Sequence, residues 1–136
     1  MKTLSIIIPL YNKEKGISNT LNLIETKCSE MKISYEILII ENESTDNSFD
    51  IANNYVKNKD NISLFRSNKG LGNALKEGVA IAKNDYVAFI PADFTFGKSE
   101  LEYFSRENSQ LSEYIIGSRA LELSLIHIWR CRRVGK

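Results

Sequence analysis

The sequence lacks several features that would assign it to particular classes of protein. Two cysteines are too few for a disulfide framework, and Cys28 falls on an apolar helical stripe, where we expect a buried free thiol in a reducing compartment. No apolar run reaches the roughly 18–20 residues of a membrane span, and no small-residue cleavage site follows the apolar start at residues 4–8. The formal net charge of +1 gives no reason to expect nucleic acid as a partner. We therefore expect one globular domain in the cytoplasm.

The end of the chain differs in composition from the rest. Through Glu122 there are 11 Lys, 3 Arg and 17 acidic residues, whereas residues 123–136 hold 3 Arg, 1 Lys, no acid and the only His and Trp. Residues 123–128 read LSLIHI, which resembles a translation of the transposon-end adapter of sequencing libraries. We therefore predict that residues 1–122 are the native body and that residues 123–136 are a non-native tail. The alternatives are a metal or anion site, although His127 and Cys131 fit no four-ligand zinc pattern, or a short amphipathic strand or helix.

Apolar runs and helical stripes alternate along the body. Short apolar runs predict buried strands at residues 4–10, 35–40, 62–65, 85–90 and 113–117. Apolar residues at helical spacing predict helices at residues 17–31, 49–56 and 71–82, and a capping box at residues 99–102 predicts another, with apolar positions to Leu111. The stripe of the third helix consists of Leu71, Leu75, Gly78, Val79 and Ala82. This order predicts an α/β fold, an open and mostly parallel Rossmann-like sheet with helices on both faces.

The loops after the predicted strands lie at one edge of such a sheet, where α/β folds bind ligands. Residues 68–78 read NKGLGNALKEG, a glycine-rich loop that opens a helix and offers N–H groups to an anion. The alternative is a plain strand-to-helix turn in which Gly78 allows close helix packing. Glu41 and Asn42 end the second strand and could bind a nucleobase or ribose. The alternative there is a solvated turn with residues 44–46 capping the next helix.

Two charged residues follow later strands. Asp93 is the best single candidate for a functional residue, because Mg²⁺ and Mn²⁺ combine hard carboxylate oxygens with substrate phosphates. Its alternative is an exposed loop aspartate. Arg119 could fork onto a phosphate, and its alternative is a surface arginine.

Together these motifs resemble those of the family 2 glycosyltransferases with the GT-A fold. That family shows, in order, Pro-x-Tyr-Asn-Glu, Val-Asp-Asp-Gly-Ser-Thr-Asp, Asn-x-Gly-x-Gly-x-Ala-x-x-x-Gly and Asp-x-Asp. Here the corresponding segments read PLYNKE at residues 9–14, IENESTD at 40–46, NKGLGNALKEG at 68–78 and PAD at 91–93. GSR at residues 117–119 is typical of the dolichol-phosphate mannose synthase-like branch. The resemblance covers residues 4–119, and the match at 68–78 argues against a flavodoxin-like or receiver domain.

The resemblance implies an inverting hexosyltransferase that uses a nucleotide-sugar donor, a UDP- or GDP-hexose, and a polyprenyl-phosphate or glycan acceptor. The residues it implies for donor binding are Pro9, Tyr11, Glu14, Glu41, Asn42, Ser44, Asn68, Gly70 and Ala92. It further implies that Asp93 carries Mg²⁺ or Mn²⁺, which neutralises the leaving diphosphate, and that Arg119 orients the acceptor phosphate. The full-length protein is then expected in the cytoplasm, peripheral to the inner face of the membrane.

Departures from the family pattern bear on activity. Lys13 replaces a glutamate for which Glu14 could substitute, and Glu41 and Asn42 replace two aspartates that bear on nucleobase preference. Pro91 replaces the first aspartate of the metal motif. The acceptor-binding half of the family's domain is also missing. We therefore predict that this chain is inactive alone, and the alternative is a catalytically degenerate nucleotide-sugar-binding module.

Overall fold

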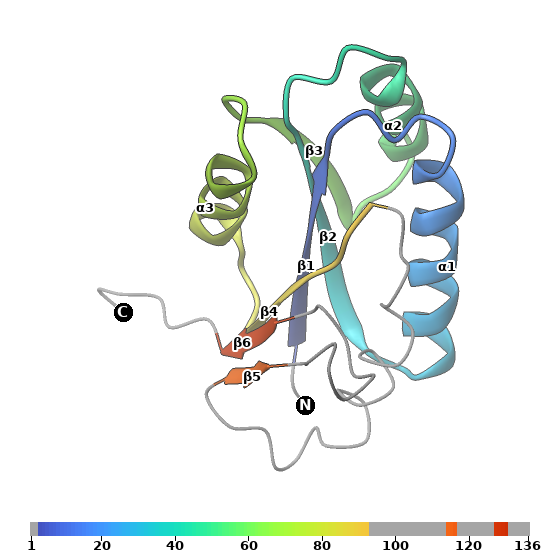
Figure 1. Ribbon diagram of the computed structural model, residues 1–136. Helices are drawn as coiled ribbons and strands as arrows, with labels where there is room; N and C mark the ends of the chain where they lie inside the picture. The colour runs from blue at the N-terminus through green and yellow to red at the C-terminus, as the bar shows by residue number, and fades with distance from the viewer. Residues whose placement is uncertain (1–2, 93–113, 117–126, 131–136) are drawn as a thin grey trace.

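Strands and helices alternate through the first part of the chain, as the sequence predicts. The computed structural model describes residues 3–92, 114–116 and 127–130 (Figure 1). The elements are β1 (Thr3–Leu10), α1 (Ile17–Glu30), β2 (Ser34–Glu41), α2 (Ser48–Val56), β3 (Ile62–Arg66), α3 (Leu71–Ile81), β4 (Tyr86–Phe89), β5 (Tyr114–Ile116) and β6 (His127–Arg130). The helix predicted from Ser99 onward lies outside the described residues. No helix in the described part of the chain is both long and apolar enough to cross a bilayer.

The sheet has the order β3-β2-β1-β4-β6-β5. The strands β1 to β4 are mutually parallel, so their carboxyl ends share one edge: Leu10 pairs with Glu41, and Glu41 pairs with Arg66. This confirms the predicted α/β fold with an open, mostly parallel sheet. The first seven elements place a helix between successive parallel strands, as right-handed crossovers require.

Beyond β4 the sheet does not continue with a parallel strand. The predicted fifth strand forms as β5, but it pairs antiparallel with β6, and β6 pairs antiparallel with β4. Because β6 occupies the edge of β4, β5 has no parallel neighbour and lies outermost. The strand β6 lies within the predicted tail, at residues 127–130, so the tail forms a short strand there, which was one of the alternatives for it. The non-native origin of the tail stays a prediction.

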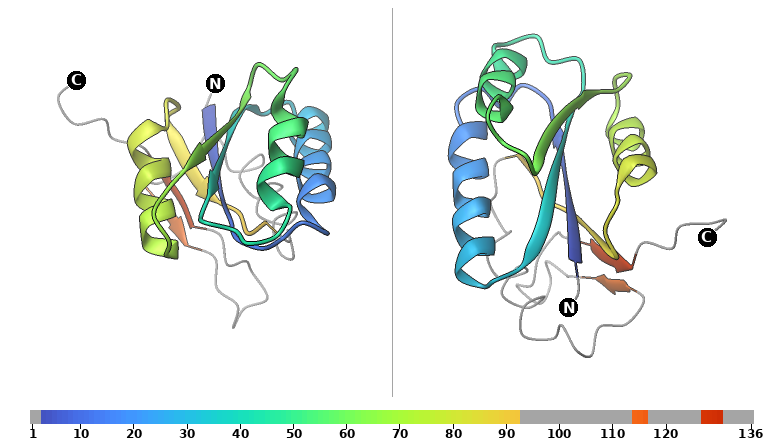
Figure 2. Two further views of the ribbon diagram at one scale, coloured as in Figure 1. Left: turned by 90° about the horizontal axis from the view of Figure 1, so that it is seen from above. Right: turned by 180° about the vertical axis from the view of Figure 1, so that it is seen from behind.

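Helices cover both faces of the sheet. Figures 1 and 2 show α1 and α2 together on one face and α3 on the other. Alternate residues of β1 serve the two sides, since successive side chains of a strand point to opposite faces. Ile6 and Ile8 belong to the apolar cluster with α1 and α2, whereas Ile7 belongs to the cluster with α3. Cys28 is buried in the first cluster as a free thiol, as predicted.

The helix α3 approaches the sheet closely through small residues. Ala74 and Gly78 are buried on its inner face, and a Cβ atom placed on Gly78 would lie 2.5 Å from Cγ2 of Ile7. This confirms close packing at Gly78. The apolar stripe marks the helix as predicted, but Leu71 and Val79 of that stripe are 60% and 43% exposed. The helix rests on the sheet through the small residues Ala74 and Gly78. Residues to either side of these two, such as Leu71 and Val79, therefore face solvent.

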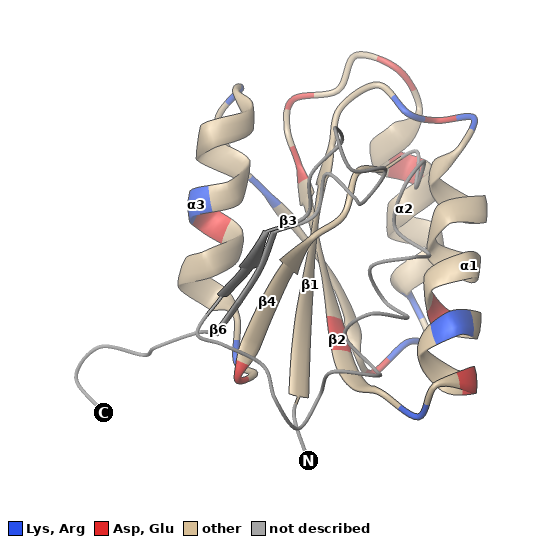
Figure 3. Cartoon of the chain, turned by 60° about the horizontal axis from the view of Figure 1, so that its bottom comes forward, with Lys and Arg blue, Asp and Glu red and all other residues tan. Residues whose placement is uncertain are grey.

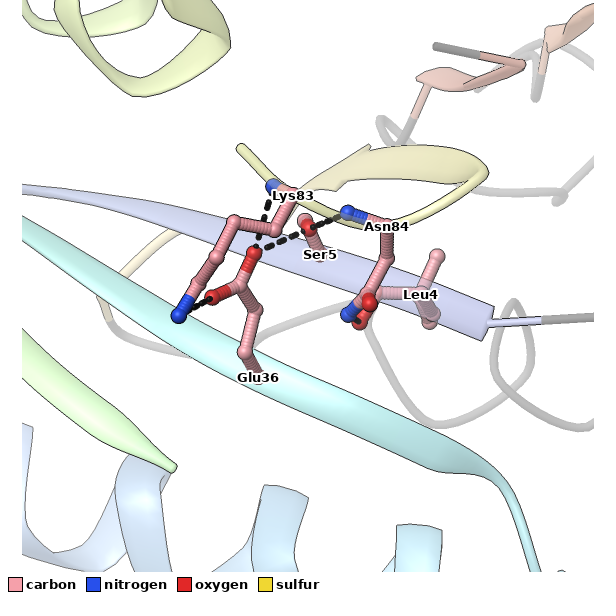
Figure 4. A network of polar contacts seen from close by, with 5 residues as sticks. All are labelled: Leu4, Ser5, Glu36, Lys83 and Asn84. Atoms are coloured by element: carbon pink, nitrogen blue, oxygen red, sulfur yellow. Dashed lines mark hydrogen bonds and ion pairs between the residues drawn. The ribbon is translucent and has the colours of Figure 1, made fainter. Parts of the chain in front are cut away.

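A buried polar network ties the α3–β4 turn to the amino ends of the strands (Figure 4). The Ser5 hydroxyl and the Lys83 backbone N–H donate to Oε2 of Glu36 at 2.6 and 2.8 Å. The Asn84 backbone N–H donates to the Ser5 hydroxyl at 3.1 Å, and its side-chain amide donates to the Leu4 carbonyl at 2.9 Å. These contacts satisfy a carboxylate that is only 9% exposed. The network lies at the edge opposite the predicted site and is structural.

Candidate functional site

A pocket of about 460 Å³ opens at the carboxyl edge of the parallel strands. Its walls come from the loop after β1, the ends of β2 and β4, and the start of α3. The lining residues are Pro9, Tyr11, Lys13, Asn42, Lys69, Gly70, Leu71, Pro91 and Ala92. Its volume lies within the roughly 300–1,000 Å³ of small-molecule sites. The pocket is therefore where an open α/β sheet places its ligand.

The structure brings together part of the predicted donor-binding set. The predicted residues on the pocket lining are Pro9, Tyr11, Asn42, Gly70 and Ala92. Other predicted residues belong to the same loops but are not on the lining; these are Glu14, Glu41, Ser44 and Asn68. Asp93 and Arg119 lie outside the described residues.

Tyr11 and two lysines give the pocket an aromatic wall and positive charge. Tyr11 is 38% exposed, and Nζ of Lys69 lies 5.4 Å from the centroid of its ring. Neither Lys69 nor Lys13 forms an ion pair with any described residue. Because the Lys69 ammonium lies over one face of the Tyr11 ring, a planar base would have to stack on the other face. The sequence did not single out the lysines, since Lys69 fills a variable motif position and Lys13 only departs from the pattern.

The start of α3 presents unpaired backbone donors to the pocket. Gly70 has φ of 119°, a conformation that favours glycine, and no side chain caps the helix. The backbone N–H groups of Leu71 and Gly72 have no hydrogen-bond partner among the described residues. Such N–H groups, together with the helix dipole, favour an anion.

Asn42 independently indicates a ligand. It is only 5% exposed, and its Oδ1 accepts a hydrogen bond from the Ser67 hydroxyl at 3.4 Å. Its Nδ2 amide has no partner among the residues that the structure describes. Because buried amide donors are normally paired, a hydrogen-bond acceptor on a ligand in the pocket would complete it.

The loops after β1 and β2 brace each other through side chains. Oε1 of Glu41 accepts the Ser44 backbone N–H at 2.6 Å, and the Ser44 hydroxyl accepts the Asn12 backbone N–H at 3.0 Å. In return, Oδ1 of Asn12 accepts the Thr45 backbone N–H at 2.7 Å. Glu41 and Ser44 therefore hold the pocket wall in shape. Figure 3 shows charged residues of both signs on these loops, beyond the ends of β1 and β2.

Asp46 extends this brace to α2. Its carboxylate accepts the backbone N–H of Ser48 at 2.9 Å and that of Glu14 at 3.2 Å. Desolvation acts to raise the pKa of Asp46, but these hydrogen bonds and that of the Ser48 side chain outweigh it, so the pKa is lowered. The Ser48 hydroxyl in turn accepts the Lys13 backbone N–H at 2.8 Å. Asp46 thus bonds the first N–H of α2 from one residue before the capping position, Asn47, whose own side chain makes no cap hydrogen bond.

A third loop joins the same assembly. The Lys69 backbone N–H donates to Oε2 of Glu43 at 2.7 Å, and the Ser67 backbone N–H donates to the Glu41 carbonyl at 3.0 Å. Glu43 takes a positive φ of 59° to make this approach. These contacts therefore fix the three loops relative to one another.

The metal predicted from the sequence has no ligand set among the described residues. Among the described residues no three acidic, His or Cys side chains gather to hold a metal. Asp93 directly follows Ala92, whose carbonyl accepts a hydrogen bond from the Thr20 hydroxyl of α1. One or two carboxylates and substrate phosphates commonly suffice for Mg²⁺. No carboxylate is on the pocket lining that the structure describes, and Asp93 lies outside the described residues, so a metal at this site stays a prediction.

Sequence comparison gives a family and several relatives. The family model described as Glycosyl transferase family 2 matches residues 5–121. A poly(ribitol-phosphate) beta-glucosyltransferase of Bacillus spizizenii is 34% identical over 111 residues, covering 77% of this chain and 17% of that protein. A dolichyl-phosphate beta-glucosyltransferase of Dictyostelium discoideum is 31% identical over 112 residues, covering 76% and 33%. The chain thus spans well under half the length of these relatives.

Solved structures show the same fold. The mannosyltransferase PcManGT from Pyrobaculum calidifontis, in complex with GDP-Man and Mn²⁺, aligns with a TM-score of 0.72 at 13% identity, covering 95% of this chain and 44% of that one. S. aureus TarS 1-349, in complex with UDP-GlcNAc, aligns with a TM-score of 0.69 at 20% identity, covering 95% and 45%. These likenesses support the GT-A type of open sheet.

Proposed function

This chain belongs to glycosyl transferase family 2, and from that membership we propose that its pocket binds the nucleotide of a nucleotide-sugar donor. The observation that carries the proposal is the convergence of Tyr11, Asn42 and the uncapped start of α3 on one pocket. Each offers what one part of a nucleotide needs: a stacking face, a hydrogen-bond donor and an anion site. PcManGT with GDP-Man and TarS with UDP-GlcNAc support a donor of this class.

The proposed reaction is an inverting transfer of a hexose. An acceptor oxygen attacks the anomeric carbon while the bond from that carbon to the diphosphate oxygen breaks. The nucleoside diphosphate leaves with the electron pair, and the configuration inverts. Catalysis then rests on positioning the donor and on neutralising the diphosphate.

Asp93 and Arg119 are the proposed catalytic residues. Asp93 would hold Mg²⁺ or Mn²⁺ beside Ala92, and the bound metal would supply charge neutralisation of the leaving group. The Mn²⁺ in the PcManGT complex supports a metal of this kind. Arg119 would orient an anionic acceptor through its guanidinium.

The proposed acceptor is a polyprenyl phosphate or a glycan. The dolichyl-phosphate and poly(ribitol-phosphate) glucosyltransferases named above support these two classes. A phosphate acceptor is already an anion and needs no strong general base. Since this chain spans only part of such enzymes, we propose that it binds donor without completing transfer, with the full-length protein in the cytoplasm at the membrane's inner face.

A catalytically degenerate binding module is the second candidate. Pro91 favours it, since it lines the pocket where the family motif has its first aspartate. The two candidates differ in how strongly binding of the donor depends on a divalent metal ion. A module would bind the nucleotide sugar equally well without a divalent cation.

Calorimetric titration tests both candidates. UDP- and GDP-sugars are titrated into the chain and into Asp93→Ala, each with Mn²⁺ and with a chelator, and the exposed Asp60→Ala serves as the matched control. A transferase fragment should bind one of them more tightly with Mn²⁺ and lose that gain in Asp93→Ala only. Binding that ignores both metal and Asp93→Ala would favour the module. No binding of any nucleotide sugar would contradict the proposed function.

A further inference from the structure

We propose that Lys13 and Lys69 contact the diphosphate of the donor directly, so that the protein itself supplies charge that a divalent cation would otherwise provide. The proposal rests on the nucleotide-binding function proposed above and assigns the phosphate subsite to this chain's own lysines.

The charge on the pocket wall is one-sided. The lining residues that the structure describes include two lysines and no carboxylate. The ion pairs of the described chain use Lys27, Lys59 and Lys83, none of which lines the pocket. Two ammonium groups around one pocket repel each other, and an anion between them would relieve that repulsion.

Both lysines are held at the pocket by their backbones, and neither ammonium forms an ion pair with a described residue. The Lys13 N–H is tied to the Ser48 hydroxyl at 2.8 Å, and the Lys69 N–H is tied to Glu43 at 2.7 Å. The Lys69 ammonium lies 5.4 Å from the Tyr11 ring centroid. A base stacked on Tyr11 would therefore carry its phosphates past Lys69 toward the unpaired N–H groups of α3.

The test separates phosphate binding from base binding. Uridine, UDP, guanosine and GDP are titrated, in buffer with EDTA, into the wild-type chain and into Lys13→Gln, Lys69→Gln and Lys13→Arg. The controls are Lys15→Gln, in the same loop as Lys13, and Lys76→Gln, exposed on α3; neither residue lines the pocket. Circular dichroism and thermal unfolding check that every variant is folded.

The wild type should bind a nucleoside diphosphate without metal. Lys13→Gln and Lys69→Gln should each weaken that binding by roughly threefold to tenfold, with no change for the nucleoside. Lys13→Arg should retain binding of the nucleoside diphosphate. Added salt should weaken this binding more in the wild type than in either glutamine variant.

Three results would overturn the inference while leaving the proposed function standing. The first is that the nucleoside diphosphate binds only when Mn²⁺ is present. The second is that the glutamine variants bind the diphosphate as tightly as the wild type. The third is that these variants lose affinity for the nucleoside and for the diphosphate equally. If the wild type binds neither nucleoside nor diphosphate under any condition, the proposed function fails together with the inference.

Discussion

The contact between Gly78 and Ile7 predicts a measurable loss of stability in Gly78→Ala. A Cβ atom at position 78 would lie 2.5, 2.8 and 2.9 Å from Cγ2, Cδ1 and Cγ1 of Ile7. Ile7 is fully buried in β1 and stiff about χ1, so α3 itself must move outward. Overpacking of this kind costs about 1–3 kcal/mol. Alanine regains about 0.5–1 kcal/mol of helix propensity, which leaves a net loss of up to about 2.5 kcal/mol.

Chemical denaturation of Gly78→Ala and Gly72→Ala measures this effect. Gly72 lies in the same helix, and a Cβ there would meet nothing within 4 Å. Gly72→Ala should therefore leave stability unchanged or slightly raised. In an Ile7→Ala background the cost of Gly78→Ala should largely disappear, because the clashing atoms are gone.

The same substitution should also affect the pocket. Gly70 and Leu71, at the start of α3, line it, so an outward shift of the helix displaces the anion-binding N–H groups. We expect nucleotide binding to weaken in Gly78→Ala and to persist in Gly72→Ala. If Gly78→Ala were as stable as Gly72→Ala, the close packing of α3 described above would be refuted.

Other expected outcomes concern the polar contacts and the thiol. Glu36→Ala should lower the free energy of unfolding in urea by about 1–3 kcal/mol, because it leaves the Ser5 hydroxyl and the Lys83 backbone N–H without their shared acceptor, yet nucleotide affinity should not change. Equal stability, or lost affinity, would contradict the structural role of the network. Ser44→Ala should weaken nucleotide binding, because it removes the acceptor of the Asn12 backbone N–H, and it should leave the melting temperature nearly unchanged. Calorimetric titration and thermal unfolding measure the two effects. Burial, with Glu25 nearby, raises the pKa of Cys28 from 9.0 to about 12. The unfolded thiol ionises first as the pH rises, so stability should be intact below about pH 9 and fall between pH 9 and 12. Cys28→Ala should flatten that fall, and an unchanged profile would argue against the burial of Cys28.

The fold followed from burial patterns in the sequence. The short apolar runs that form β1 to β4 are typical of strands covered on both faces of a sheet. The helices between them favour parallel pairing. The sequence could not show that β6 would take the free edge of β4, because edge pairing depends on which distant segment arrives there. Spacing alone placed Leu71 and Val79 in the apolar stripe of α3, whereas the small buried residues Ala74 and Gly78 mark the side that faces the sheet.

The site was only partly accessible to sequence reasoning. Strand ends predict which loops meet, and Tyr11, Asn42 and Gly70 do meet in one pocket. Spacing could not distinguish a side chain that faces the pocket from one that braces a loop. Oε1 of Glu41 bonds to the Ser44 N–H, a contact that only the folded loop reveals. The lysines were overlooked because their significance depends on lacking ion-pair partners, a property of the folded chain.

The central claim is that a nucleotide occupies the pocket at the carboxyl edge of β1 to β4. Amide chemical shifts of the ¹⁵N-labelled chain, followed as UDP or GDP is added, test it most directly. We predict concentration-dependent shifts for Tyr11, Asn42 and Gly70, with none for Ser5 or Asn84 at the opposite edge. Shifts confined to that opposite edge, or none with either nucleotide, would contradict the claim.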